Sequence, residues 1–348
     1  MTMEEGACDG ATYCVTGASG YIGSWLVRAL LVKGYSVHAT VRDPDKVSYL
    51  LPKWDGGDRL KLFKADLNEE GSFDEAVLGC DGVFHVAASM EFSVPAQPNI
   101  ESYVQLQMID PAIRRTLNLL KSCKKSKSVK RVVFTSSIST ITAKDDGGHW
   151  KFIVNESCRL QPDNVWSAKA DGWVYALSKL QTEDAAFGYA SENSIDLVSV
   201  VVSTVAGPFI TSGVPVSIRV ILSPITGDPY LSPILKAVNA RMGSICLVYI
   251  EDICNAHIFL MEHPKAKGSY ICSAANIHVS RLFQLLAKAY PSPNITSTMG
   301  SELGTAPCEI SAKKLKDMGF EYQYGIEKIV NDTIKLCVEC RYLPPLMQ

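Results

Sequence analysis

The residues best suited to chemistry are Tyr175 and Lys179, which lie four residues apart in a segment with helical spacing. This spacing puts both side chains on one face of a helix. A phenol with a pKa of about 10 is a poor acid at neutral pH, but a neighbouring ammonium group stabilises the phenolate and lowers that pKa. Tyr175 would then give a proton to a substrate oxygen while hydride reaches the adjoining carbon. Ser137 would hydrogen-bond the same oxygen and stabilise its developing charge.

A Tyr-x-x-x-Lys pair occurs by chance in many helices, so its meaning depends on the elements around it. The chain has a glycine-rich segment, Thr16 to Gly23, between an apolar run at 11–16 and helical spacing at 25–33. A tight turn between a strand and a helix lets the backbone approach a pyrophosphate, which the helix N-terminus stabilises. The segment therefore predicts a dinucleotide site formed by Gly17, Ser19, Gly20, Tyr21, Ile22 and Gly23.

The residue that follows the second predicted strand indicates which dinucleotide binds. Many NAD-binding proteins have an acid there that holds the adenine ribose hydroxyls. This chain has Arg42, with Lys46 nearby. A guanidinium group can pair two donors with a 2′-phosphate and stack on adenine, which favours NADPH, although a simple surface arginine is the alternative. The adjacent Asp43 would repel the phosphate unless its side chain points away.

The other expected cofactor contacts follow strand ends, because ligands bind at the carboxyl edge of a parallel sheet. Asp66 and Leu67 follow the third strand and would lie near the adenine ring. Val86, Ala87 and Ala88 end the fourth strand and would lie beside the nicotinamide half. The remaining predicted contacts are Thr135, Ser136, Tyr175, Lys179, Val202 and Ser203.

Alternating strands and helices predict a doubly wound α/β fold of the Rossmann type, because each parallel strand needs a crossover connection. Strands are expected at 11–16, 35–41, 60–64, 82–87, 130–135 and 197–205, with a long helix at 174–192. The cofactor domain would span residues 1–206. A smaller, mostly helical substrate domain would span 207–348, with helices near 216–222, 280–289 and 325–336, and with residues 245–262 returning to the Rossmann domain.

Composition limits the classes of partner. With 348 residues and 47% hydrophobic content, the chain has the composition of a globular protein. Its net charge of −2 does not favour nucleic acid as a partner. No apolar run reaches the roughly 18 residues of a membrane helix. The N-terminal segment 1–9 lacks a secretory pattern, so a cytoplasmic location is expected. The oligomeric state stays open.

Cysteines and histidines give no metal site. The eleven cysteines are scattered and odd in number, so reduced thiols are expected. Only Cys337 and Cys340 have a Cys-x-x-Cys spacing, and no second pair or histidine completes a metal site, although a redox role for this pair stays open. His85, His257 and His263 lie in or beside packed elements without metal-ligand spacing, which favours a structural role.

The order of these parts resembles that of the extended short-chain dehydrogenases/reductases: a glycine-rich turn, a Ser at a strand end, then Tyr and Lys on the next long helix. The strings Val15–Val27, Thr40–Pro44, Val83–Ala87 and Val133–Ser137 resemble the plant dihydroflavonol reductase family, and Cys272–Asn276 is more similar to its anthocyanidin reductase members. The resemblance covers most of the chain. It implies an NADPH-dependent reductase of a plant aromatic metabolite, a flavonoid of the anthocyanidin or dihydroflavonol type.

Several positions depart from that family's pattern. Thr142 stands where dihydroflavonol reductases have an Asn that contacts the flavonoid, so the implied substrate contacts are Ser137, Tyr175 and this altered Thr142. Val202 replaces a Pro, and Ala88-Ser89 replaces Thr-Pro. The substrate therefore stays open, with an isoflavanone, a cinnamoyl-CoA or an alkaloid as alternatives. Alcohol oxidation, nucleotide-sugar epimerisation and NADPH sensing without turnover are the other functions weighed.

Overall fold

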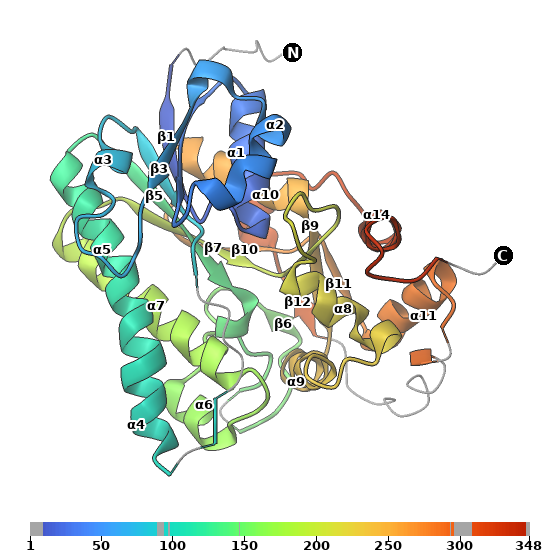
Figure 1. Ribbon diagram of the computed structural model, residues 1–348. Coiled ribbons are helices and arrows are strands. Elements are labelled where there is room, and N and C mark those ends of the chain that lie inside the picture. The colour runs from blue at the N-terminus through green and yellow to red at the C-terminus, as the bar shows by residue number, and fades with distance from the viewer. Residues whose placement is uncertain are drawn as a thin grey trace.

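The computed structural model describes residues 10–88, 94–96, 98–145, 147–292, 294–295 and 308–345, so the predictions for residues 1–9 and Ser89 lie outside the described residues. A parallel sheet runs through the centre of the molecule in the order β10-β7-β5-β4-β1-β2-β3 (Figure 1). Its strands are β1 (Thr12–Thr16), β2 (Ser36–Val41), β3 (Leu60–Lys64), β4 (Gly82–His85), β5 (Arg131–Ser137), β7 (Leu197–Val202) and β10 (Gly268–Cys272).

The central strands are buried on both faces. All six residues of β7, Leu-Val-Ser-Val-Val-Val, are buried, and all neighbouring strand pairs of this sheet run parallel. β-branched side chains favour extended backbone, and a strand covered on both faces needs no polar alternation. The predicted doubly wound Rossmann-type sheet is confirmed. Strand order reverses beside β1, which puts a crevice at the carboxyl ends of β1 and β4.

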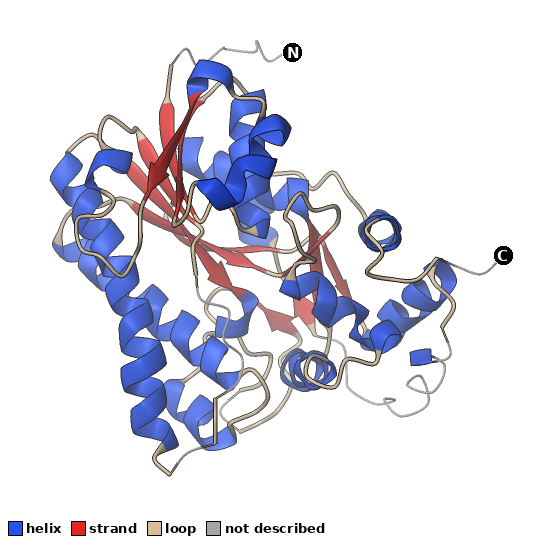
Figure 2. Cartoon of the chain, viewed as in Figure 1, coloured by secondary structure: helices blue, strands red, loops and turns tan. Residues whose placement is uncertain are grey.

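Helices cover both faces of this sheet (Figure 2). Helix α1 (Tyr21–Val32) packs against α10 (Ile250–Glu262), while α5 (Asp110–Ser126) packs against α3 (Asp74–Val77) and α7 (Trp173–Glu192). Within the described ranges, no helix is both long and apolar enough to cross a membrane. The shorter helical elements of this part are η1 (Asp45–Leu50), α2 (Leu51–Trp54), η2 (Gly57–Arg59), α4 (Ile100–Val104), η3 (Gln105–Ile109), η4 (Ile138–Thr140) and α6 (Pro162–Ala168).

The C-terminal part of the chain adds two small sheets and further helices. Strands β8 (Thr204–Ala206), β9 (Ile245–Tyr249) and β11 (Ala275–Ile277) form one sheet, and β6 (Ile153–Val154) pairs with β12 (Glu309–Ile310) in the other. The helices around these sheets are α8 (Val216–Thr226), α9 (Ser232–Met242), α11 (Val279–Ala289), α13 (Lys313–Lys316) and α14 (Ile326–Glu339).

The single strand predicted at 197–205 is wrong. Strand β7 ends at Val202 and β8 begins at Thr204 in a different sheet. Between them the Ser203 amide donates to the Cys272 carbonyl of β10 at 3.1 Å, so the chain leaves the large sheet for the small one at this residue. Strand β10 itself was not predicted. The division of the chain into domains at residue 206 stays a prediction.

Candidate active site

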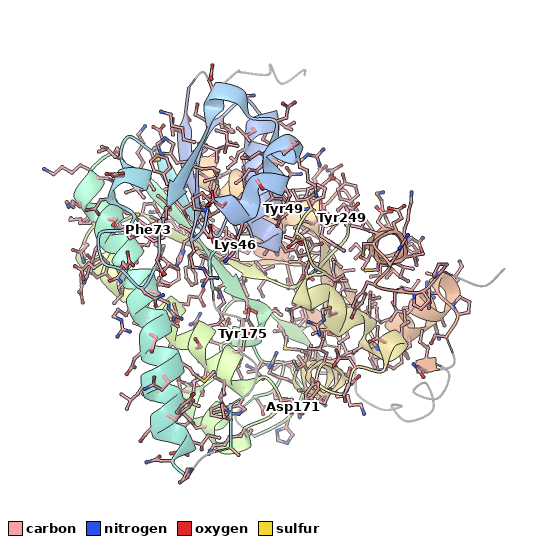
Figure 3. The ribbon with its side chains drawn as sticks, in the orientation of Figure 1. Lys46, Tyr49, Phe73, Asp171, Tyr175 and Tyr249 are labelled. Atoms are coloured by element: carbon pink, nitrogen blue, oxygen red, sulfur yellow. The ribbon has the colours of Figure 1, made fainter. Side chains whose placement is uncertain are left out.

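A cavity of about 900 Å³ opens at the carboxyl ends of the central strands. Figure 3 shows Tyr175 near the middle of the molecule, with Lys46 and Tyr49 above it. The structure brings nearly all predicted site residues together on the cavity wall. They are Gly17, Ser19, Gly20, Tyr21, Ile22, Gly23, Arg42, Asp66, Leu67, Val86, Ala87, Ala88, Thr135, Ser136, Ser137, Tyr175, Lys179, Val202 and Ser203. Lys46 and Thr142 are not part of this wall.

The glycine-rich turn is closed against itself and against β4. The Gly20 amide donates to the Gly17 carbonyl at 2.9 Å, and α1 begins directly after Gly20. A Cβ on Gly17 would lie 2.9 Å from the Ala87 Cα, and a Cβ on Gly23 would lie 2.1 Å from the Gly17 carbonyl oxygen. Since no side chain fits here, the backbone and the N-terminus of α1 stay open to the cavity. This arrangement fits a dinucleotide pyrophosphate.

Arg42 and Lys46 lie in different surroundings. Arg42 is exposed and borders the cavity at the end of β2. The Lys46 ammonium lies 3.1 Å from the Asp43 carboxylate, and 81% of its side chain is exposed. The hydrogen bond and charge of Lys46 lower the pKa of Asp43. The Asp43 carboxylate is therefore paired with Lys46, and Lys46 does not line the cavity.

Ser137 and Tyr175 meet on the cavity wall. Their side chains are hydrogen-bonded, and this bond lowers the pKa of Tyr175, but burial has the larger effect and raises the pKa above its ordinary value. The sequence predicted a lowered pKa for Tyr175. This prediction is wrong for the protein without cofactor, because burial outweighs the effect of the hydrogen bond. A raised pKa keeps the phenol protonated at neutral pH, so Tyr175 holds its phenolic proton in the protein without cofactor.

Lys179 is fixed from behind by β5 and α10. Its Nζ donates to the Thr135 carbonyl at 3.0 Å. The Thr135 hydroxyl lies 2.9 Å from Nε2 of His257, whose Nδ1 lies 2.7 Å from the Ile253 carbonyl. Because a carbonyl only accepts, Nδ1 carries the proton and Nε2 accepts from Thr135. Burial lowers the pKa of Lys179 to about 8 and that of His257 to about 4.

His85 joins three elements behind the cavity. The Thr16 hydroxyl accepts from the amides of Val86 and Ala87, both at 3.1 Å, so its own proton goes to His85 Nδ1 at 3.0 Å. His85 then donates from Nε2 to the Thr116 hydroxyl at 3.1 Å. Burial, with the nearby charge of Lys179, lowers the pKa of His85 to about 3, so the ring stays neutral. These bonds fix β1, β4 and α5 relative to one another.

Three buried hydroxyls on the cavity wall have no hydrogen-bond partner within the described part of the chain. They belong to Ser136, Thr182 and Ser203. Buried polar groups are nearly always satisfied, so such hydroxyls in one cavity indicate a polar ligand. The carboxamide, ribose and phosphate groups of a dinucleotide would supply partners. With the open glycine turn, this is the second observation that fits such a cofactor.

The sequence missed the segment that closes the cavity on the C-terminal side. Thr211, Gly213, Val214, Pro215, Val216 and Ser217 line it. The segment is attached to the nucleotide-binding part, because Lys53 Nζ donates to the Ile210 carbonyl at 3.0 Å and the Ser212 amide donates to the Tyr49 hydroxyl at 3.3 Å. In the sequence, only the repeated prolines after residue 207 distinguish this region from the one before it. Phe73, Arg115 and Thr116 are further wall residues that no local pattern indicated.

Thr142 lies outside the cavity wall. Its amide donates to the Cys158 carbonyl at 2.9 Å, and its hydroxyl accepts from the Lys144 amide at 3.2 Å. The hydroxyl therefore stabilises the local turn. A direct substrate contact by Thr142 is not supported by this position.

Cys337 and Cys340 are free thiols that lie in different surroundings. Cys337 is buried in α14, and burial with the neighbouring Cys340 raises its pKa to about 12, whereas Cys340 is exposed. Because the thiolate is the reactive form, we expect a maleimide to modify Cys340 and to leave Cys337 unmodified in the native protein, as read by peptide mass spectrometry. Equal labelling of both, or a Cys337–Cys340 disulfide in protein purified without reductant, would contradict this.

The fold and the glycine-rich turn, with Tyr and Lys one helical turn apart on α7, define an extended short-chain dehydrogenase/reductase. The chain belongs to the NAD dependent epimerase/dehydratase family, whose sequence profile matches residues 13–273. The family predicted from the sequence is confirmed.

Its relatives include plant reductases. The chain is 47% identical to a putative anthocyanidin reductase of Ginkgo biloba, over 93% of each chain. It is 42% identical to a dihydroflavonol 4-reductase of Arabidopsis thaliana, over 96% of this chain and 84% of the relative. Among solved structures, vestitone reductase from alfalfa superposes with a TM-score of 0.78 at 32% identity, covering 95% of this chain and 99% of that one.

Proposed function

We propose that this chain is an NADPH-dependent reductase of a flavonoid, an anthocyanidin or a dihydroflavonol. The hydrogen-bonded pair of Ser137 and Tyr175, on the wall of a cavity that also contains the glycine-rich turn, carries the proposal. The flavonoid class is supported by the plant relatives, at 41–47% identity, that are named as anthocyanidin and dihydroflavonol reductases. A cytoplasmic location is part of the proposal, since the ten cysteines in the described residues are free thiols, which suits a reducing compartment.

In this mechanism a bound nicotinamide supplies hydride to an electrophilic carbon of the substrate. Tyr175, kept protonated by the desolvation of its phenol, donates its phenolic proton to the substrate oxygen. Ser137 donates a hydrogen bond to the same oxygen and stabilises the negative charge that develops on it. Lys179, held by the Thr135 carbonyl, supplies the positive charge that stabilises the phenolate left on Tyr175.

The proposal assigns the 2′-phosphate of NADPH to Arg42, which borders the cavity. We expect Arg42→Ser to raise the KM for NADPH by about ten- to a hundredfold, because a charge-assisted pair of hydrogen bonds is lost. The KM for NADH should change little. Steady-state kinetics with both cofactors measures the effect.

Lys46→Ser is the matched control for this variant. Since Lys46 pairs with Asp43 and does not line the cavity, its KM for NADPH should stay near the wild-type value. An equal loss in both variants would show that general positive charge, and not Arg42, selects the cofactor.

NADPH consumption by the wild-type protein tests the function itself. The substrates to compare are cyanidin, dihydroquercetin, an isoflavanone and a cinnamoyl thioester, with products resolved by chromatography. Reduction of cyanidin or dihydroquercetin is the expected result. Reduction of only the isoflavanone or the thioester would overturn the flavonoid class, and binding of NADPH with no turnover of any substrate would favour a sensor.

A further inference from the structure

Glu183 on α7 is a fully buried acid that the proposed mechanism does not use. No part of its side chain is exposed. Its carboxylate accepts from Arg159 Nη1 at 2.7 Å, from the Ser199 hydroxyl at 2.5 Å and from the Ser269 hydroxyl at 3.3 Å. These donors come from the segment before α6, from β7 and from β10. Taking a carboxylate out of water is costly even when it is paired, so the position of Glu183 needs an explanation.

The ion pair with Arg159 does not by itself explain a buried acid. Arg159 has a second carboxylate, Asp184, whose oxygen lies 2.5 Å from its Nη2 atom and whose side chain is 59% exposed. Asp184 neutralises Arg159 at the surface, where a carboxylate keeps much of its hydration. Glu183 and Asp184 are neighbours on α7, yet only Glu183 is sealed from solvent. The buried acid therefore has a role beyond the neutralisation of Arg159.

That role is indicated by the side chain one helical turn away. Glu183 follows Lys179 by four residues on α7, so both side chains lie on one face of the helix. Lys179 is buried as well, and it lines the cavity. Burial lowers the pKa of Lys179 to about 8, and the charge of Glu183 opposes this change. A negative charge on this face of α7 favours the ammonium form of Lys179 over the neutral amine.

The other titratable groups around Lys179 are neutral. His85 on β4 and His257 on α10 are buried, and burial lowers their pKa values to about 3 and about 4, so both rings are uncharged. Tyr175 keeps its phenolic proton, because burial raises its pKa. Among the described residues, Glu183 is thus the charge that opposes the desolvation of Lys179.

We propose that Glu183 is a positioning residue that keeps Lys179 in its ammonium form beside Tyr175. The inference rests on the proposed function, because it concerns the charge that stabilises the phenolate of Tyr175 in that reaction. Glu183 does not line the cavity, so it touches neither substrate nor cofactor. It acts through Lys179 from one turn further along α7, where Arg159 and Ser199 hold its carboxylate.

Titration of Lys179 by NMR tests this inference without any substrate. The lysines carry ¹³C at Cε, the Lys179 signal is assigned by its loss in Lys179→Met, and spectra are recorded with and without NADP⁺. We expect Lys179 in Glu183→Gln to lose its proton about one pH unit lower than in the wild type, because a stabilising charge is removed. Glu183→Asp retains the charge and should titrate close to the wild type.

Asp184→Asn is the matched control. It removes the adjacent carboxylate of α7, which pairs with the same Arg159 guanidinium group, and it should leave the titration of Lys179 unchanged. If Glu183→Gln does not fold, the double variant Arg159→Met/Glu183→Gln decides the question. This variant replaces a buried ion pair with neutral side chains, which proteins often tolerate, and it should lower the titration of Lys179 in the same direction.

The pH profile of kcat separates an electrostatic role from a structural one. A neutral Lys179 no longer stabilises the phenolate, so kcat should fall as pH rises through the pKa of Lys179, which is about 8 in the wild type. In Glu183→Gln this fall should begin about one pH unit lower, which lowers kcat about threefold near pH 7.5. Lowering the pH to 6 should restore kcat, because Lys179 is then protonated in both proteins.

The inference is overturned if Lys179 titrates as in the wild type in Glu183→Gln or in the double variant, or if Asp184→Asn lowers the titration equally. A loss of kcat in Glu183→Gln that is the same at every pH would assign Glu183 a structural role instead. The outcome is separable from the proposed function. A lowered titration of Lys179 without flavonoid turnover removes only the proposed function, whereas flavonoid turnover with an unchanged titration removes only the inference.

Discussion

Replacing Tyr175 with Phe should lower kcat by about a thousandfold or more while the Kd for NADPH stays close to the wild-type value. The change removes one oxygen, and with it the proton that the substrate oxygen needs when hydride arrives. A positioned acid contributes about 10²–10⁴-fold to such a step. Burial raises the pKa of Tyr175, so the phenol carries this proton at neutral pH. Turnover is read from NADPH absorbance, and binding from cofactor fluorescence.

Two comparisons isolate the role of Tyr175. Tyr189→Phe makes the same change on the same helix, at a residue that does not line the cavity, and should leave kcat unchanged. The hydrogen bond between Ser137 and Tyr175 is also lost, which costs about 1 kcal/mol of stability, so Tm should fall by only about 1–2 °C. Turnover that survives in Tyr175→Phe would remove Tyr175 from the mechanism.

Replacing Gly23 with Ala should damage both cofactor binding and stability. The new Cβ would lie 2.1 Å from the Gly17 carbonyl oxygen and 2.8 Å from the Gly17 carbonyl carbon. Both are backbone atoms, so no side chain can rotate to relieve the contact and the turn must open. Overpacking of this kind costs about 1–3 kcal/mol, which lowers Tm by about 1–4 °C in a chain of this length. The Kd for NADPH should rise by about ten- to a hundredfold, because the turn no longer presents its amides to the pyrophosphate.

Gly188→Ala is the matched control for the glycine turn. Gly188 lies inside α7, and a Cβ there meets no atom within 4 Å. Alanine is favoured over glycine in a helix interior by about 1 kcal/mol, so this variant should keep wild-type NADPH affinity and an equal or higher Tm. Gly23→Ala with an unchanged Kd for NADPH would show that the turn does not contact the cofactor.

The sequence determined those features that depend on local pattern. Strand and helix periodicity, with the glycines at the first strand–helix turn, predicted the parallel sheet and the place of the cavity, because residues at the ends of parallel strands meet at one edge. The sequence analysis also predicted that Ser137, at the end of β5, and Tyr175, on α7, belong to one site. Both residues line the cavity. The predicted strand through Ser203 was wrong because an apolar run does not show where a chain changes sheets.

Only the tertiary structure decided contacts between segments distant in the sequence. Burial reversed the expected shift in the pKa of Tyr175, because desolvation depends on every element that surrounds the phenol. Lys46 and Thr142 lie near site residues in the chain, yet their local partners Asp43 and Lys144 hold them outside the cavity wall. Sequence spacing fixes neighbours along one element, while burial and pairing are set by the elements that pack against it.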